Sequence, residues 1–184
     1  FEREVDYISN NQYKYLEINT NDNYENIAKK TLLAFEKISS ICEFDYVFRT
    51  NTSSFIDLKK FRSFILKNID SLDYSGSVLK AIEGDLIASG AGFFISKENI
   101  KIILDNRKYF DSSLPDDVAI ARLLYKFNIK PKNLIRKNLK SIPKPEEILE
   151  SNHFHYRCRL DPQYHRILEP LLMNYLDVAS KENK

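Results

Sequence analysis

Two neighbouring acids, Asp116 and Asp117, follow Pro115 at the start of a segment whose apolar residues recur at helical spacing. The helix dipole favours the ionised form of a carboxylate at such a place, and an ionised carboxylate can accept a proton from a reacting hydroxyl group. Acids at helix starts are also common without any chemistry, because they cap the helix. From these residues alone capping is the preferred interpretation, and general-base chemistry is the alternative.

A second polar group follows the β-forming run at residues 44–48. An arginine fork matches phosphate well, and small polar side chains add hydrogen-bond donors. The segment is therefore either an ordinary exit from a strand, with its arginine in a surface salt bridge, or a ligand site delivered to the strand's C-terminal end. Its residues are Arg49, Thr50, Asn51, Thr52, Ser53 and Ser54.

All four glycines lie between residues 76 and 92, and three of them lie inside two segments that otherwise have the composition of strands. Glycine within a strand indicates a bulge or a close approach of the backbone to another group. Nearer the C-terminus, His153 and His155 alternate within a candidate strand, and Arg157 continues the alternation. Alternate residues of a strand share a face, so this face could serve a ligand site, although structural histidines are as compatible with the pattern.

The chain alternates between strand and helix patterns, which favours a layered α/β domain. Expected strands lie at residues 13–18, 44–48, 73–79, 85–96 and 153–160. Expected helices lie at residues 24–41, 58–69, 98–106, 115–127 and 162–178.

Composition excludes several classes of protein. The formal charge of the 184 residues is +2, which argues against a dedicated nucleic-acid binder. No uncharged apolar run reaches the length of a membrane span. Two cysteines, Cys42 and Cys158, are too few for a disulfide framework, so a reducing compartment such as the cytoplasm is the default.

Five segments in one order resemble the β-1,3-galactosyltransferase and Fringe-type glycosyltransferases, across roughly residues 13–176. DNYENIAKKT is similar to their DSYxNLTxKT, through Asp22, Tyr24, Asn26, Lys30 and Thr31. ASGAGFFISKENI resembles (C/A)SGxGYxxS, PDDVAIARLL resembles EDVxxGxxL, and HFHYRCR resembles the closing histidine-containing strand. RTNTSS stands where these enzymes carry a DDD metal motif, and bacterial and large-virus members with RTN-x-SS are also similar.

The resemblance implies a GT-A-like layered fold, with a mixed central sheet flanked by helices. It implies a nucleotide-sugar donor, first of all a UDP-sugar, and transfer to a hydroxyl of a glycan or glycoprotein acceptor, with inversion. Asp117 then matches the catalytic base and Asp116 supports it. The remaining expected donor-site residues are Arg49 to Ser54, Gly90, Ala91, Gly92, Arg157 and Tyr74, whose ring could stack on a sugar or pack in the core.

The chain departs from the family at the metal motif, because none of residues 49–54 is acidic. A hard divalent cation that bridges a diphosphate prefers charged oxygen ligands. Three outcomes follow. Mn²⁺ or Mg²⁺ binds weakly, through Asn51 with His153 or His155; Arg49 and hydroxyl donors hold the diphosphate in place of a metal; or the chain is a non-catalytic carbohydrate- or nucleotide-binding relative. We favour the second outcome, in which Arg49 holds the diphosphate.

The resemblance begins after the first strand–helix–strand unit of the GT-A fold, and the chain starts at Phe1 without an initiator methionine. We therefore expect residues 1–184 to form one GT-A-like domain whose N-terminal part lies upstream. The expected location is the cytoplasm of a bacterium or of a virus-infected host, or the Golgi lumen if an anchor precedes this chain.

Overall fold

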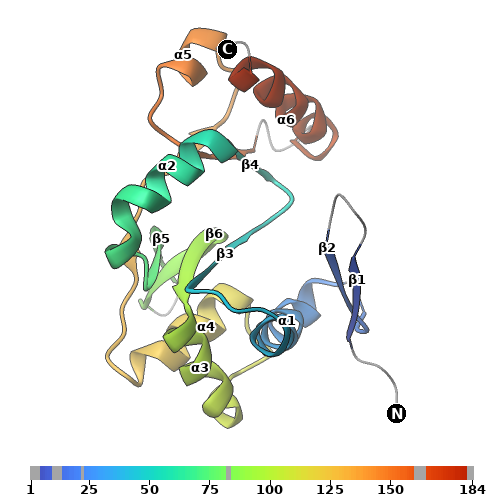
Figure 1. Cartoon of the computed structure of the whole chain (residues 1–184), viewed down its shortest axis with the longest axis vertical. Coiled ribbons are helices and arrows are strands. Elements are labelled where there is room, and N and C mark those ends of the chain that lie inside the picture. The colour runs from blue at the N-terminus through green and yellow to red at the C-terminus, as the bar shows by residue number, and fades with distance from the viewer. Residues whose placement is uncertain (1–4, 10–13, 22, 82–83, 160–164, 182–184) are drawn as a thin grey trace.

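A four-stranded mixed sheet with the order β3-β6-β5-β7 forms the centre of the fold (Figure 1). The computed structural model describes residues 5–9, 14–21, 23–81, 84–159 and 165–181. The long strand β6 pairs antiparallel with β3 and β5, and β7 runs parallel to β5. The strands are β3 (Tyr46–Thr50), β5 (Tyr74–Lys80), β6 (Leu86–Ser96) and β7 (Lys132–Asn133).

Helices cover both faces of this sheet, which explains why nearly all of β6 is buried. Alternate side chains of β6 point to opposite faces. Phe93 and Ile95 pack in a core with residues of three helices, whereas Phe94 packs in a second, aromatic core against α2. The three helices of the first core are α1 (Ile27–Ile41), α3 (Lys97–Asp105) and α4 (Asp116–Tyr125), and α2 spans Leu58–Asn68.

A second mixed sheet has the order β4-β9-β8. One of its faces contributes Phe55, Tyr156 and Cys158 to a third core with α5 and α6. The opposite face carries polar residues, and it lies next to the middle of β6. The elements are β4 (Ser54–Ile56), β8 (Lys137–Leu139), β9 (His155–Cys158), α5 (Pro145–Leu149) and α6 (His165–Lys181).

The N-terminal hairpin of β1 (Val5–Ser9) and β2 (Lys14–Ile18) lies beside α1, at the right-hand edge of Figure 1. Short 3-10 helices lie at η1 (Tyr24–Asn26), η2 (Ile69–Ser71) and η3 (Arg107–Tyr109).

The expected layered α/β architecture is confirmed, with two mixed sheets flanked by helices in a GT-A-like arrangement. The expected helices form, and Ser96 caps α3 by accepting a hydrogen bond from the Asn99 amide at 3.2 Å. The strand expected at residues 44–48 runs instead over Tyr46–Thr50, so Arg49 lies inside it. No helix in the described ranges has the length and apolarity that crossing a membrane requires.

Candidate functional site

A buried ion pair joins the end of β3 to the start of α4. Arg49 Nη2 lies 2.6 Å from Asp116 Oδ2, and the two side chains are 16% and 4% exposed. Thr31 on α1 donates a hydrogen bond to the same carboxylate oxygen at 2.9 Å. Burial raises the pKa of Asp116, while the guanidinium of Arg49 and the hydroxyl of Thr31 oppose that rise. Asp116 therefore supports the site structurally.

Arg49 also donates a hydrogen bond from Nη1 to the Gly90 carbonyl. Its guanidinium is thus engaged by a carboxylate and a backbone oxygen at the same time. Arg49 lines the pocket, but Asp116 already balances its charge, so it is less suited to hold a diphosphate than an arginine without a carboxylate partner. The sequence could not reveal the pairing, since the two residues are far apart along the chain.

Asp117 is held against β6 by backbone amides. The Gly90 amide donates to Asp117 Oδ2 at 2.7 Å, and the Val118 amide donates to Oδ1 at 3.0 Å. A Cβ atom added at Gly90 would lie 3.0 Å from Asp117 Oδ2 and 3.3 Å from Arg49 Nη1. Glycine at this position therefore lets both side chains approach the strand, and the carboxylate of Asp117 has a fixed orientation.

A pocket of about 250 Å³ opens beside these groups. Asp116 and Asp117 line it from α4, Gly90 and Ala91 from β6, and Arg157 from β9. Further lining residues are Tyr24, Ile27, Arg49, Asn51, Leu79, Ser89 and Arg159. The structure thus brings seven of the expected site residues to one cavity that contains carboxylates as well as guanidinium groups.

The RTNTSS segment anchors this cavity to the surrounding elements. The hydroxyl of Thr50 donates to the Ala91 carbonyl at 2.9 Å. Ser54 Oγ lies 2.9 Å from the same carbonyl oxygen and 3.0 Å from Asn51 Oδ1, so its single proton serves one of these acceptors at a time. Ser53 is buried and donates to Glu169 Oε2 on α6 at 2.9 Å, whereas Thr52 is exposed.

His155 fills the space beside Gly92. A Cβ atom at Gly92 would lie 2.3 Å from His155 Cε1, so any other residue there would collide with the ring. His155 Nε2 lies 3.1 Å from Ser54 Oγ. Burial, with help from the nearby charge of Arg136, lowers the pKa of His155 to about 4. The glycines of β6 therefore accommodate protein side chains in this structure, where a sugar was expected.

The two histidines do not converge. His153 precedes β9, and its Nδ1 lies 2.9 Å from Ser151 Oγ, whereas His155 points toward β6. The expectation of a shared face does not hold, because the alternation of a strand applies only within the strand. Burial lowers the pKa of His153 as well, and Lys137 and Lys60 add to this effect.

The residues at the expected metal position do not fit a hard divalent cation. Asn51 Oδ1 accepts a hydrogen bond from the Ser53 amide at 3.1 Å and faces the Ser54 hydroxyl. The carboxylate of Asp116 is paired with Arg49. Within the described residues, no group of three or more His, Cys, Asp or Glu side chains has the arrangement of a metal site.

Tyr74 lies in the core. It is 1% exposed and packs with Phe93 at a ring-centroid distance of 6.2 Å. Its hydroxyl accepts a hydrogen bond from the Ala88 amide at 3.4 Å. Of the two alternatives for Tyr74, the structure therefore shows core packing, and the ring presents no open face to a sugar.

Several residues of the site were not expected to take part in it. Thr31 was noted only as a matching motif position, and Asp22 of the same motif lies outside the described residues. Arg136 and Ser89 had no local signal, because isolated arginines and serines are common on surfaces. Arg136 and Ser89 meet near the pocket only because segments far apart in the chain lie side by side in the fold, and no local pattern in the sequence encodes this contact.

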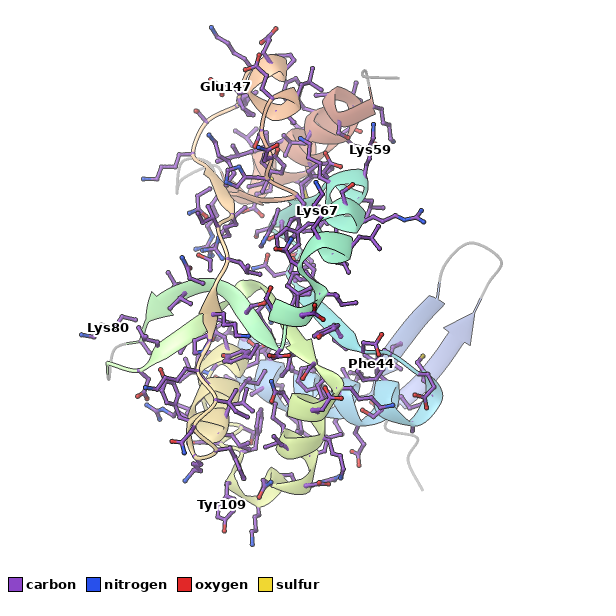
Figure 2. The ribbon with its side chains drawn as sticks, turned by 60° about the vertical axis from the view of Figure 1, so that its left-hand side comes forward. Phe44, Lys59, Lys67, Lys80, Tyr109 and Glu147 are labelled. Carbon is purple, nitrogen blue, oxygen red and sulfur yellow. The ribbon has the colours of Figure 1, made fainter. Side chains whose placement is uncertain are left out.

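A second cavity, of about 520 Å³, lies along α2 and contains Lys59, Lys60 and Lys67 in its lining. Figure 2 shows Lys59 and Lys67 on this helix, in the half of the molecule away from Tyr109. Lys60 Nζ is engaged by the Ile148 carbonyl at 2.7 Å. The cavity holds one carboxylate, Asp57, and that side chain caps α2 by accepting from the Lys60 amide. It therefore offers no free base comparable to Asp117.

Replacing Arg49 with methionine should lower the free energy of unfolding by about 3–5 kcal/mol near pH 7, because an unpaired carboxylate would stay buried. The raised pKa of Asp116 means that the folded carboxyl holds its proton more tightly than the unfolded one. The stability that protonated Asp116 contributes is therefore present below the pKa of 3.8 that the carboxyl has in the unfolded chain, and it is lost as the pH rises through the pKa of the folded state.

Urea unfolding of Arg49→Met at about pH 7 and about pH 4 measures this effect, and the loss should be smaller at the lower pH. Lys97→Met is the matched control, because it breaks the exposed pair with Glu43 at 2.7 Å and should change little. Equal losses at both pH values would contradict the assignment of the effect to ionised Asp116.

The depressed pKa of His155 predicts acid sensitivity. Folded His155 stays neutral down to a pKa of about 4, whereas the unfolded group titrates at 6.5. Stability from this group is therefore complete above pH 6.5 and falls by up to about 3 kcal/mol as pH drops to about 4. His155→Gln should flatten the decline in denaturant unfolding over this range. His153→Gln, at a less buried position, should flatten it less, and an unchanged pH profile in His155→Gln would refute the prediction.

Comparison with protein families finds a match to the galactosyltransferase family model over residues 6–87. This range covers just under half of the chain and contains the RTNTSS segment and Tyr74. Gly90, Asp117 and Arg157 lie beyond it, and contacts across the pocket join them to the matched part. Comparison with curated proteins finds no match. The matched part of the chain is therefore similar to the galactosyltransferase family.

Proposed function

We propose that this chain transfers a sugar from a nucleotide-sugar donor, first of all a UDP-sugar, to a hydroxyl group of a glycan or glycoprotein, with inversion at the anomeric carbon. One observation carries the proposal. The Asp117 carboxylate is fixed by the Gly90 amide at 2.7 Å, in a pocket that also contains residues of the family-matched strand β3. A carboxylate held in a cavity beside arginines suits proton abstraction next to an anionic leaving group.

In this mechanism Asp117 takes the proton from the acceptor hydroxyl. The hydroxyl oxygen forms a bond to the anomeric carbon while the bond from that carbon to the diphosphate oxygen breaks, and the nucleoside diphosphate leaves with the bonding electron pair. The Arg49–Asp116 pair positions Asp117 by holding the start of α4 against β6. Positioning of this kind supplies much of the rate enhancement in group transfer.

The same residues support transfer with weak or no dependence on a divalent metal. A cation that bridges a diphosphate needs charged oxygen ligands, whereas Asn51 Oδ1 is occupied by local donors and Asp116 by Arg49. Stabilisation of the leaving group then falls to hydrogen-bond donors and guanidinium groups of the pocket.

A second candidate function is non-catalytic binding of a carbohydrate or nucleotide. It is favoured by the full engagement of Arg49 and by the lack of acids in residues 49–54. The enzyme and the binding protein differ in turnover, which makes them separable by one assay.

Sugar transfer or donor hydrolysis, screened over a panel of nucleotide-sugars, tests the proposal through Asp117→Asn. The variant should lose about 10²–10⁴-fold in turnover, which is typical of a removed general base, while its donor affinity stays close to wild type. Asp70→Asn is the matched control, since Asp70 is exposed on η2. Full activity in Asp117→Asn would refute the base assignment, and nucleotide binding without any turnover would favour the binding protein.

Metal dependence is a separate test. We expect turnover in excess EDTA to stay within about threefold of turnover with added Mn²⁺, because the donor set at residues 49–54 lacks charge. Initial rates measured across a chelator and metal titration decide this. Activity that vanishes in EDTA and returns with Mn²⁺ would show that other groups bind the metal.

A further inference from the structure

Arg136 is a buried cation without an acidic partner. It directly precedes β8 and is 9% exposed. Its Nε donates to Asn138 Oδ1 and its Nη1 donates to Ser89 Oγ, both at 2.9 Å. No carboxylate in the described parts of the chain forms an ion pair with it. A buried charge is costly when nothing of opposite sign is near, so this arrangement requires an explanation.

A second, half-buried arginine lies beside it. Arg157 pairs in register with Asn138 and with Ser54, so it lies on the polar face of the second sheet. Its Nε is buried and has no hydrogen-bond partner within the described residues. Burial lowers the pKa of Arg136 to about 10, and the positive charge of Arg157 contributes to this shift. Burial lowers the pKa of Arg157 too, and the charge of Arg159 adds to this effect, while the negative charges of Glu169 and Asp117 oppose it.

One of these guanidinium groups lines the pocket that contains Asp117, and the other contacts a residue of its lining. Arg157 lines the pocket directly, and so does Ser89, whose hydroxyl is the acceptor for Arg136. The carboxylate of Asp116 does not balance them, because Arg49 lies 2.6 Å from it. Glu169 and Asp117 act on Arg157 with opposite charge, but Arg159 also lies at this wall, so three guanidinium groups face two carboxylates. The surplus of positive charge is one that a bound anion would neutralise.

A purely structural role explains Arg136 less well. Bridging Ser89 to Asn138 needs two donors and no charge, which a neutral amide side chain could supply at a lower desolvation cost. A binding role accounts for the charge, because guanidinium forks recognise phosphate oxygens in pairs.

We propose that Arg136 and Arg157 form an anion site for the diphosphate of the nucleotide-sugar donor, in the role that a divalent cation would otherwise fill. This assignment rests on the proposed function for the identity of the donor. Free pyrophosphate shares the chemistry and serves as a probe that does not depend on the sugar-transfer reaction.

Calorimetric titration with UDP and with inorganic pyrophosphate, each in excess EDTA, tests the site on the full chain. Arg136→Gln and Arg157→Gln should each weaken binding by about tenfold to a hundredfold, the range for a lost hydrogen bond between charged groups. Lys137→Gln is the matched control, because it removes one positive charge from the neighbouring, exposed position of β8. The control should stay within about twofold of wild type.

Thermal unfolding gives a second readout that separates binding from structure. Arg136→Met should unfold at the same temperature as the wild type or a higher one, because an unpaired buried charge is removed. Pyrophosphate should raise the unfolding temperature of the wild type, by mass action, and should fail to raise that of the variant. A lower unfolding temperature for Arg136→Met, with the pyrophosphate effect retained, would establish a structural role and overturn the proposal.

Failure of this inference differs from failure of the proposed function. Pyrophosphate binding that depends on Arg136, in a chain that transfers no sugar, would retain the anion site and reject the enzyme. Sugar transfer that is unaffected by Arg136→Gln and Arg157→Gln, together with unchanged UDP affinity, would reject the anion site and retain the enzyme. A wild-type chain that binds neither UDP nor pyrophosphate would overturn the anion site.

Discussion

The buried ion pair between Arg49 and Asp116 is the interaction on which the arrangement of the site depends. It joins β3 to α4, and through Thr31 it includes α1, so three elements of the larger layer meet at one carboxylate. Asp117 follows Asp116 in the chain, and its place against Gly90 is a consequence of that anchorage. The side chains of Arg49 and Asp116 are 16% and 4% exposed, and burying such a pair is costly.

The second sheet closes the site from the other side. Its apolar face is covered by α5 and α6, so its polar face is directed at β6. Close approach is possible because Gly92 leaves room for the His155 ring and because the Ala91 carbonyl accepts hydroxyl groups from Thr50 and Ser54. The RTNTSS segment thus serves chiefly to join the two sheets. This arrangement places Arg157 of β9 in the lining of the pocket formed with β6 and α4, and Arg136, which directly precedes β8, in contact with Ser89 of that lining.

Charge is distributed unequally around that pocket. On the side of β3 and α4 the guanidinium of Arg49 is balanced by Asp116, and the remaining carboxylate, Asp117, is bound by neutral amides. On the side of β8 and β9, Arg136 forms no ion pair among the described residues, and Arg157, whose Nε has no hydrogen-bond partner there, is only partly balanced by the nearby charges of Glu169 and Asp117. A base on one side and unbalanced cations on the other would suit a reaction in which a proton is taken and an anion departs.

The sequence by itself determined the layered α/β architecture and most helices, because apolar periodicity and caps such as Ser96 act over a few residues. It also indicated Asp117 and the RTNTSS segment as parts of one site. Strands as short as β4, β7 and β8 gave no periodic signal, and they form only where distant segments supply their partners. The tertiary structure alone decided that Arg49 pairs with Asp116, that Tyr74 is in the core, that the two histidines diverge and that Arg136 is buried beside Arg157. Each of these results depends on contacts between residues far apart in the chain, and such contacts set the burial and net charge of a site in a way that local residue types do not.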